Sequence, residues 1–223
     1  MKALGLAVAC GLLLLGAAAG GAQAHQFTTK IDNPYLPLAP GSRWVYHDRL
    51  TGERTVVRVT NETKRIANGV TARVIRDTVR KKGRVVEDTS DWYAQDERGS
   101  VWYMGEDTKE YAHGKVSSTE GSWEAGVDGA RAGIAMPGHP RVGRQYRQEY
   151  YAGQAEDMAR VLSVDDQVEV PAGHYKRALL TREWTPLEPD VLEYKLYARG
   201  VGVVLETTVS GGAERNELVS FHR

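Results

Sequence analysis

Cysteine is almost absent from this sequence of 223 residues, in which Cys10 is the only one. Cys10 falls within an N-terminal leader, so we expect the mature chain to lack disulfides, thiolate metal sites and a cysteine nucleophile. Phenylalanine is also scarce, with two residues against 11 Tyr and five Trp. An exported domain of this composition has to be stabilised by its packed core.

Net charge is absent as well, because Lys plus Arg and Asp plus Glu both number 29. Loss of Lys2 with the leader would leave a single excess negative charge. Such a chain has no general electrostatic field that attracts nucleic acid or an anionic membrane, so nucleic-acid binding is disfavoured.

Motifs for common chemistries are missing too. The sequence contains no G-x-S-x-G elbow and no S-x-x-K pair, which serine hydrolases use. It also lacks the zinc-protease, P-loop and EF-hand patterns. These absences argue against an enzyme without excluding one, since catalytic triads on β folds need no local motif. No cofactor is predicted.

The N-terminus has the pattern of a cleavable signal peptide. Lys2 precedes an apolar run from Leu4 to Ala19, and Ala22-Gln23-Ala24 gives the small-x-small cleavage pattern. We predict a signal peptide over 1–24, a mature start at His25 and a periplasmic or extracellular location. The run is short and ends in a cleavage site, which disfavours a retained membrane anchor. It also continues past Cys10, which disfavours lipidation.

The remaining chain of about 200 residues is long enough for one ordinary domain. A proline-rich lead-in over 25–42 is expected to run extended across the sheet edge, with Tyr35, Leu36 and Leu38 tucked in. Residues 43–223 are expected to form a β domain. Within it, six glycines and two prolines predict an irregular loop over 121–143, which could act as a lid near one mouth of the sheet.

Strand-like runs alternate with turn residues through the rest of the chain. The turns are predicted at Thr51-Gly52, Asn68-Gly69, Lys82-Gly83, Arg98-Gly99 and His113-Gly114. Between 191 and 198, Leu192, Tyr194 and Leu196 are expected to face inward. We find no convincing amphipathic helix; 155–162 could form one or two helical turns, but strand is favoured. The predicted fold is all-β, a single antiparallel meander forming a strongly curved sheet or open barrel.

The hairpin over 89–106 is the most aromatic stretch. Asp96 and Gly99 fit a three-residue loop, which would place Ala94 opposite Trp102, Tyr93 opposite Tyr103 and Trp92 opposite Met104. Trp92 and Trp102 would then share a core face, while Asp91, Tyr93 and Tyr103 would share a face that is either wet or lines a cavity. A two-residue Arg98-Gly99 turn would move Trp102 to the Asp91 side.

Five segments carry a family resemblance: 33–38 (NPYLPL), 40–46 (PGSRWVY), 91–96 (DWYAQD), 168–175 (VEVPAGHY) and 197–204 (YARGVGVV). The chain resembles an uncharacterised family of secreted bacterial β-rich proteins with V-x-V-P-A-G-x-[FY] and Y-A-x-G-V-G-x-V signatures. The resemblance implies export and an antiparallel β fold, and it brings no catalytic residues with it.

Acidic residues are concentrated around the hairpin: Glu87, Asp88, Asp91, Asp96, Glu97, Glu106, Asp107 and Glu110. Paired carboxylates can hold Ca²⁺ or act as general acid and base in glycoside hydrolysis. We favour a solvated strand face balanced by the basic turn at 80–84, and we predict no metal site. A free N-terminal His25 could hold copper with His113, His139 or His174, but no spacing singles out a partner.

Three hypotheses follow. The first is a non-catalytic binding protein that holds an apolar or glycan-like ligand on the concave face of its sheet, because Tyr and Trp suit half-wet clefts. Its candidate contacts are Asp91, Trp92, Tyr93, Trp102, Tyr103, Trp123 and His139. The second is a secreted hydrolase that uses the hairpin carboxylates, with His139 of the 121–143 loop as a further candidate, and the third is a structural envelope protein without a small ligand. The sequence does not define an oligomeric state.

Overall fold

The computed structural model describes residues 26–223, so the predicted leader and the copper site proposed at His25 lie outside the described residues. Within 26–223 the elements are all strands. No helix long and apolar enough to cross a membrane occurs in this described range. The predicted all-β class is confirmed.

Sixteen strands within the described residues make up the sheet. Their bounds are β1 Phe27–Thr28, β2 Arg43–Asp48, β3 Glu53–Arg65, β4 Thr71–Lys81, β5 Arg84–Asp96, β6 Val101–Ala112, β7 Lys115–Ser118, β8 Trp123–Glu124, β9 Arg131–Met136, β10 Gln145–Arg147, β11 Glu149–Tyr150, β12 Met158–Val170, β13 Gly173–Trp184, β14 Leu192–Ala198, β15 Gly202–Ser210 and β16 Arg215–His222.

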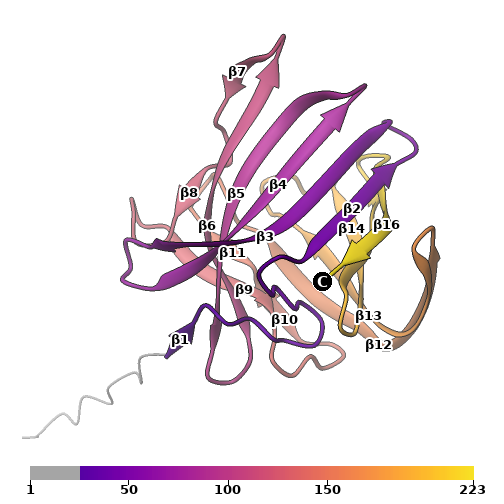
Figure 1. Cartoon of the computed structure of the whole chain (residues 1–223). Coiled ribbons are helices and arrows are strands. Elements are labelled where there is room, and N and C mark those ends of the chain that lie inside the picture. Colours follow the sequence, from indigo (N-terminus) through magenta and orange to yellow (C-terminus); the bar gives the residue numbers. More distant parts are fainter. Residues whose placement is uncertain (1–25) are drawn as a thin grey trace, which may run out of the picture.

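Two meanders form the barrel-like body in Figure 1. Strands β2 to β6 pair in sequence order, as do β12 to β16, and the C-terminal β16 joins the two halves by pairing with β2. Every pairing is antiparallel, and each turn between neighbouring long strands is short. This is the curved antiparallel meander that the turn spacing predicted.

The barrel is nearly closed, with one seam. On one side β6 pairs β9 and β9 pairs β11, while on the other side β10 pairs β12. Only Gln148 separates β10 from β11 along the chain. The segment 145–150 therefore belongs to both edges, and the backbone N–H of Gln148 donates to the Asp157 carbonyl at 2.8 Å beside the seam.

The five turns predicted from glycine positions all fall between strands. At the β5–β6 turn the Gly99 N–H donates to the Asp96 carbonyl at 3.0 Å and the Asp96 N–H donates to the Ser100 carbonyl at 2.9 Å. Gly99 has φ of 79°, which is the left-handed position that such a loop requires. The Asp96 carboxylate also accepts from the Arg98 and Ser100 N–H groups. The two-residue alternative is therefore wrong.

The expectation that 121–143 holds no regular element is wrong. Arg131–Met136 forms β9, which pairs with the start of β6 at 101–103. Trp123–Glu124 forms β8, which pairs with β6 at 105–106. The glycines allow close backbone approach here instead of preventing a strand: a Cβ on Gly133 would lie 2.3 Å from the Gln148 carbonyl carbon. Gly-rich spacing is compatible with a strand where another backbone needs that room.

The predicted hairpin register holds for Ala94 opposite Trp102 and for Tyr93 opposite Tyr103. It is wrong one step further, because Trp92 lies opposite Gly105 instead of Met104. A β-bulge at this point places one extra residue in β6. Gly105 has φ of 125°, and a Cβ there would lie 2.2 Å from the Trp123 carbonyl oxygen.

The bulge has a consequence for the interior of the barrel. Side chains on a strand alternate between faces, so one extra residue inverts the alternation beyond it. Tyr103 lies beside Tyr93 on the inner face, and Glu106, opposite Asp91, lies on that same face. Without the bulge, Glu106 would point outward with Met104.

The lead-in closes the lower end of the barrel in Figure 1. The Asn33 side chain donates to the Gly99 and Pro137 carbonyls at 2.8 and 3.2 Å, and the Gly200 N–H donates to the Pro34 carbonyl at 2.8 Å. Tyr35 and Leu38 are buried, as expected. The lead-in thus spans turns from both halves of the barrel, where the sequence had suggested a single sheet edge.

Buried apolar side chains form two clusters. The interior core includes Trp44, Tyr46, Ile75, Leu179 and Val204. A second cluster packs the other face of the hairpin around Ile66, Ala72, Trp92, Ala94 and Met104. The sequence had placed the core on the Trp92 face only, whereas the opposite face of the hairpin contributes to the inside of the barrel.

We predict that Gly105→Ala is far more destabilising than Gly114→Ala. Both glycines have positive φ, but nothing lies within 4 Å of a Cβ on Gly114. The left-handed backbone alone costs about 1–2 kcal/mol for a residue with a Cβ. Gly105→Ala adds a clash with the β8 backbone and should lose about 3 kcal/mol or more. Urea unfolding measures both, and equal losses would show that the bulge is not fixed by β8.

Candidate functional site

A cavity of about 330 Å³ lies inside the barrel. Its apolar lining comes from the lead-in and from both meanders and includes Leu36, Leu38, Trp44, Val57, Ile75, Val79 and Val203. Its polar lining consists of Tyr46, Thr55, Asp77, Asp91, Tyr93, Glu206 and Asn216. Ligand pockets typically have this character, with an apolar wall and a few placed polar groups, and this one is near the small end of their size range.

Asp77 on β4 is the most unusual of these groups. Its Oδ1 is buried and accepts no hydrogen bond from the described residues. It lies in register with Val57 on one side and Thr89 on the other. Burial, followed by the charge of Asp91, raises the pKa of Asp77 well above its ordinary value. An ionised carboxylate in this position is costly unless something pairs with it.

Asp91 and Glu106 are neighbours across β5 and β6. The Tyr103 hydroxyl donates to Asp91 at 2.7 Å, and the Tyr103 ring stacks on Tyr93 with centroids 4.7 Å apart. Burial raises the pKa of Asp91 to about 6, against the opposing effect of the Tyr103 hydrogen bond. Burial and the charge of Asp91 raise the pKa of Glu106 to about 7.

Glu149 extends the acidic interior toward the seam. It accepts from the Trp123 indole N–H at 3.0 Å. Burial, with further contributions from Asp157 and Glu106, raises the pKa of Glu149 to about 8. Together with Asp91 and Glu106 it makes an interior in which several carboxyl groups stay protonated at a pH where exposed ones would not.

Lys195 on β14 is the cation of this interior. Its ammonium lies 3.1 Å from Glu183 and 3.0 Å from Glu206. Burial alone lowers the pKa of Lys195, but Glu183 and Glu206 outweigh it and hold the pKa well above its ordinary value. Glu183 also accepts from the Thr181 and Tyr197 hydroxyls at 2.7 and 3.1 Å. This network is satisfied within the protein.

The seven residues predicted as ligand contacts occupy three places. Asp91 and Tyr93 line the cavity. The Tyr103 hydroxyl donates a hydrogen bond to Asp91, and the Trp123 indole donates one to Glu149. These four therefore belong to the interior.

The other three lie elsewhere. Trp92 and Trp102 are on the opposite face of the hairpin, where the Lys64 ammonium sits 4.4 Å from the Trp92 ring and the Trp102 indole donates to Asp96. His139 lines a separate surface hollow with Tyr35, Arg177 and Arg199.

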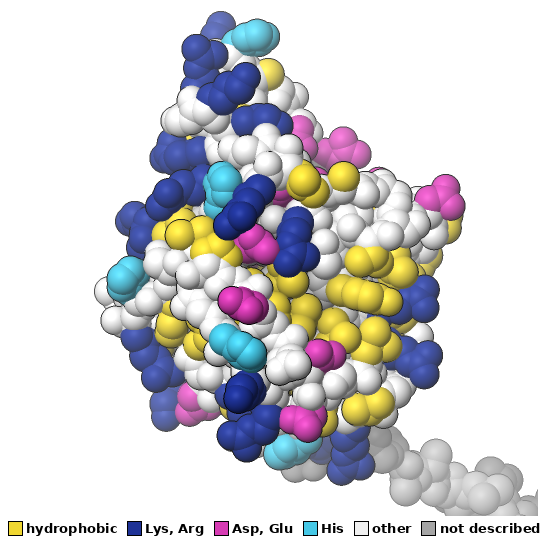
Figure 2. Space-filling view, turned by 90° about the vertical axis from the view of Figure 1, so that its right-hand side faces the viewer, with side chains coloured by type: hydrophobic (Ala, Val, Ile, Leu, Met, Phe, Trp, Pro, Cys, Tyr) yellow, Lys and Arg dark blue, Asp and Glu magenta, His cyan; other side chains and the backbone are white. Residues whose placement is uncertain are grey.

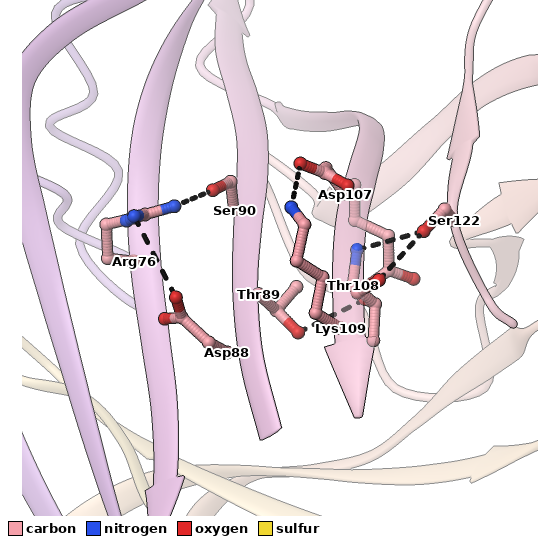
Figure 3. Close-up of polar contacts among 9 residues, drawn as sticks. Arg76, Asp88, Thr89, Ser90, Asp107, Thr108, Lys109 and Ser122 are labelled. Carbon is pink, nitrogen blue, oxygen red and sulfur yellow. Dashed lines mark hydrogen bonds and ion pairs between the residues drawn. The ribbon is translucent and has the colours of Figure 1, made fainter. Parts of the chain in front are cut away.

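The predicted acidic cluster divides in the same way. Asp91 and Glu106 face inward, whereas Asp88 and Asp107 pair with Arg76 and Lys109 among the polar contacts drawn in Figure 3. The buried Thr89 and Thr108 hydroxyls meet at 3.1 Å. No three acidic, histidine or cysteine side chains within 26–223 are grouped as a metal would require.

Sequence reasoning missed Asp77, Glu206 and Lys195. Asp77 falls on the same side of β4 as Ile75 and Val79, and an acid on the apolar side of a strand was a signal that could have been used. Lys195 is one position out of phase with Leu192, Tyr194 and Leu196, which the sequence had assigned to the inside. The ion pairs of Lys195 place its own side of β14 toward the acidic interior, so the assignment is wrong for the half-buried Leu192 and Tyr194, although Leu196 is buried in the main core cluster.

A third hollow lies outside the barrel, between the tips of the β4–β5 and β6–β7 hairpins. It is lined in part by Arg80, Lys81, Lys82, Arg84 and His113. Figure 2 shows Lys and Arg side chains gathered at this upper end of the molecule. The basic turn is thus an exposed hairpin tip, as the sequence suggested.

Comparisons with known proteins add little about function. No family model matches the chain, and no curated protein matches it. Among solved structures, the chain is similar to a Bacteroides fragilis protein described as exported, with a YmcC-like fold (14% identity, 85% of this chain and 99% of that one, TM-score 0.49). It is also similar to a protein of Parabacteroides distasonis described as a lipoprotein (12% identity, the same coverage, TM-score 0.44). Both TM-scores are below 0.5, so neither neighbour supplies a function for this chain.

We predict that Lys195→Met destabilises the protein by about 2–3 kcal/mol, because it leaves the buried Glu183 and the partly exposed Glu206 without their cation. Lys176→Met, at an exposed position on the neighbouring β13, should change stability little. Adding Glu183→Gln to Lys195→Met should recover part of the loss. Denaturant unfolding measures all three variants, and a Lys195→Met protein as stable as Lys176→Met would contradict the network.

We also predict that the protein melts at a higher temperature at pH 5 than at pH 8.5. Asp91, Glu106 and Glu149 have folded pKa values of about 6, 7 and 8, above their ordinary values. Because the folded state binds these protons more tightly than the unfolded state, the stability that they contribute is fully present near pH 4. This contribution is lost as the pH rises through the folded pKa values of about 6 to 8.

Asp91→Asn tests the origin of this pH dependence. It removes one of the three ionisations, so the fall in melting temperature between pH 5 and 8.5 should become smaller. For a shift of roughly 2 pKa units the gain at pH 8.5 is about 3 kcal/mol at most. A wild-type melting temperature that rises over this range would contradict the assignment of protonated interior carboxyls.

Proposed function

We propose that this chain is an exported, non-catalytic binding protein that holds a small ligand with a largely apolar body inside its barrel. The observation that carries the proposal is the cavity with Asp77 at its wall. A protein interior is normally close-packed, and this partly open cavity of about 330 Å³ is far larger than an ordinary packing defect. Export is the expectation from the predicted leader.

The distribution of polar groups supports binding over a purely structural role. A structural barrel gains stability by filling its interior with apolar side chains. Here the interior keeps a cavity and places Asp77 and Asp91 on its wall, each at a cost in desolvation. Costly groups that converge on a cavity are typical of sites retained for function.

A secreted hydrolase is the second candidate, favoured by the adjacent carboxyls of Asp91 and Glu106 with raised pKa values. Such a pair could serve as general acid and base. Two observations weigh against it: Glu106 is not among the residues that line the cavity, and His139 lies in a different hollow. The aliphatic part of the cavity wall favours a ligand with an apolar body over a glycan.

We predict that the neutral fluorescent probe N-phenyl-1-naphthylamine binds one site per chain, and that Val57→Phe weakens this binding at least tenfold. Val57 lines the cavity, so a larger side chain there reduces its volume. Val142→Phe is the matched control, because Val142 is 61% exposed and outside the cavity. Fluorescence titration measures binding, and near-ultraviolet circular dichroism checks that both variants fold. Equal affinity for the two variants would place the probe elsewhere and contradict the proposal.

A further inference from the structure

We infer that the ligand held in the barrel carries a positively charged amine, and that Asp77 receives it. The inference rests on the proposed function and adds the chemical class of the ligand. Three acidic residues line the cavity, Asp77, Asp91 and Glu206. The complete set of lining residues includes no Lys, Arg or His.

The three acids differ in how many hydrogen-bond or ion-pair partners the protein gives them. Glu206 is paired with Lys195 at 3.0 Å, and Asp91 accepts the Tyr103 hydroxyl at 2.7 Å. Asp77 keeps a buried oxygen that accepts no hydrogen bond from residues 26–223. It is therefore the group on the cavity wall that gains most from an incoming partner.

The surroundings of Asp77 define the partner's charge. Ile75 and Val79 flank it on β4, and Val57 lies opposite on β3, so the carboxyl is set in an apolar wall. The acidic groups that act on it are Asp91 and Glu87 of β5, Glu206 of β15 and Asp88. All of these repel a negative charge on Asp77, and a cation in the cavity would relieve both that repulsion and the desolvation.

The aromatic lining points to the same chemistry. The Trp44 indole N–H donates to the Val201 carbonyl at 2.7 Å, and the Tyr46 hydroxyl donates to the Val203 carbonyl at 2.9 Å. Both polar ends are thus occupied by the backbone, and Phe221 stacks on one face of Trp44, so what these two rings offer the cavity is apolar ring surface. Aromatic rings attract ammonium groups and offer nothing to an anion.

An anionic ligand fits poorly by the same accounting. Thr55 and Asn216 are the remaining neutral donors on the wall apart from Tyr93, and Lys195 already bridges Glu183 and Glu206. A carboxylate or phosphate would bring a further negative charge next to Asp77 and Asp91 without a cation to meet it. The expected ligand is a small organic amine with an apolar body.

Three probes that share one body test this inference: 4-phenylbutylamine, 4-phenylbutanol and 4-phenylbutanoate. Calorimetric titration of the full chain at pH 8 should show the amine binding at least tenfold more tightly than the alcohol, and the carboxylate more weakly than either. Equal affinities for amine and alcohol, or tightest binding of the carboxylate, would overturn the amine assignment while leaving the binding function standing. Failure of all three to bind at millimolar concentration would overturn both.

Asp77→Asn locates the charge recognition. We expect it to weaken amine binding at least tenfold while alcohol affinity stays within twofold, and to raise the melting temperature, which also reports that the variant folds. Asp165→Asn, at an exposed position on β12, should leave all affinities and the melting temperature unchanged. If Asp77→Asn binds the amine as tightly as the unsubstituted chain does, another group receives the cation and the inference is wrong.

Discussion

The charge balance inside the barrel is the constraint from which the rest of this structure is best understood. The ammonium of Lys195 faces this interior, and its two ion pairs use Glu183 and Glu206. Among residues 26–223, no Lys or Arg forms an ion pair with Asp77, Asp91 or Glu106. Burying an unpaired carboxylate costs several kcal/mol of folding free energy. Each of these carboxyls is therefore stabilised either by protonation or by a cationic ligand.

The fold supplies this interior through a few backbone features. The bulge at Gly105 turns Glu106 to the side of Asp91, and the close approach of β8 requires glycine at that position. The lead-in closes one end and contributes Leu36 and Leu38 to the cavity wall. Segment 145–150 brings the two edges of the sheet together at Gln148. Cavity, bulge and seam are thus parts of one closed arrangement.

Much of this architecture could be predicted from the sequence. The glycine turns and the β-branched runs gave the all-β meander, and Asp96 with Gly99 gave the hairpin register near its turn, because these are local signals. The bulge at Gly105 and the strand at 131–136 could not be predicted in this way, since both depend on the approach of a distant backbone. Part of the site could be predicted: Asp91 and Tyr93 followed from the alternation of side chains along the hairpin. Lys195 could not, because Leu192 and Tyr194 indicated the other side of β14 as the inner one. Asp77 lies between the apolar Ile75 and Val79, which indicate a core face and not a polar site.

The central claim is that Asp77 has a buried carboxyl oxygen that accepts no hydrogen bond from residues 26–223. Carbon-13 NMR of the Asp77 carboxyl during a pH titration tests it most directly. The account predicts that the carboxyl titrates well above its ordinary pKa of 3.8 in the free chain, and that this pKa falls when a cationic ligand is bound. Titration near 3.8 in the free chain would show that the carboxylate is already solvated or paired, and would contradict the account.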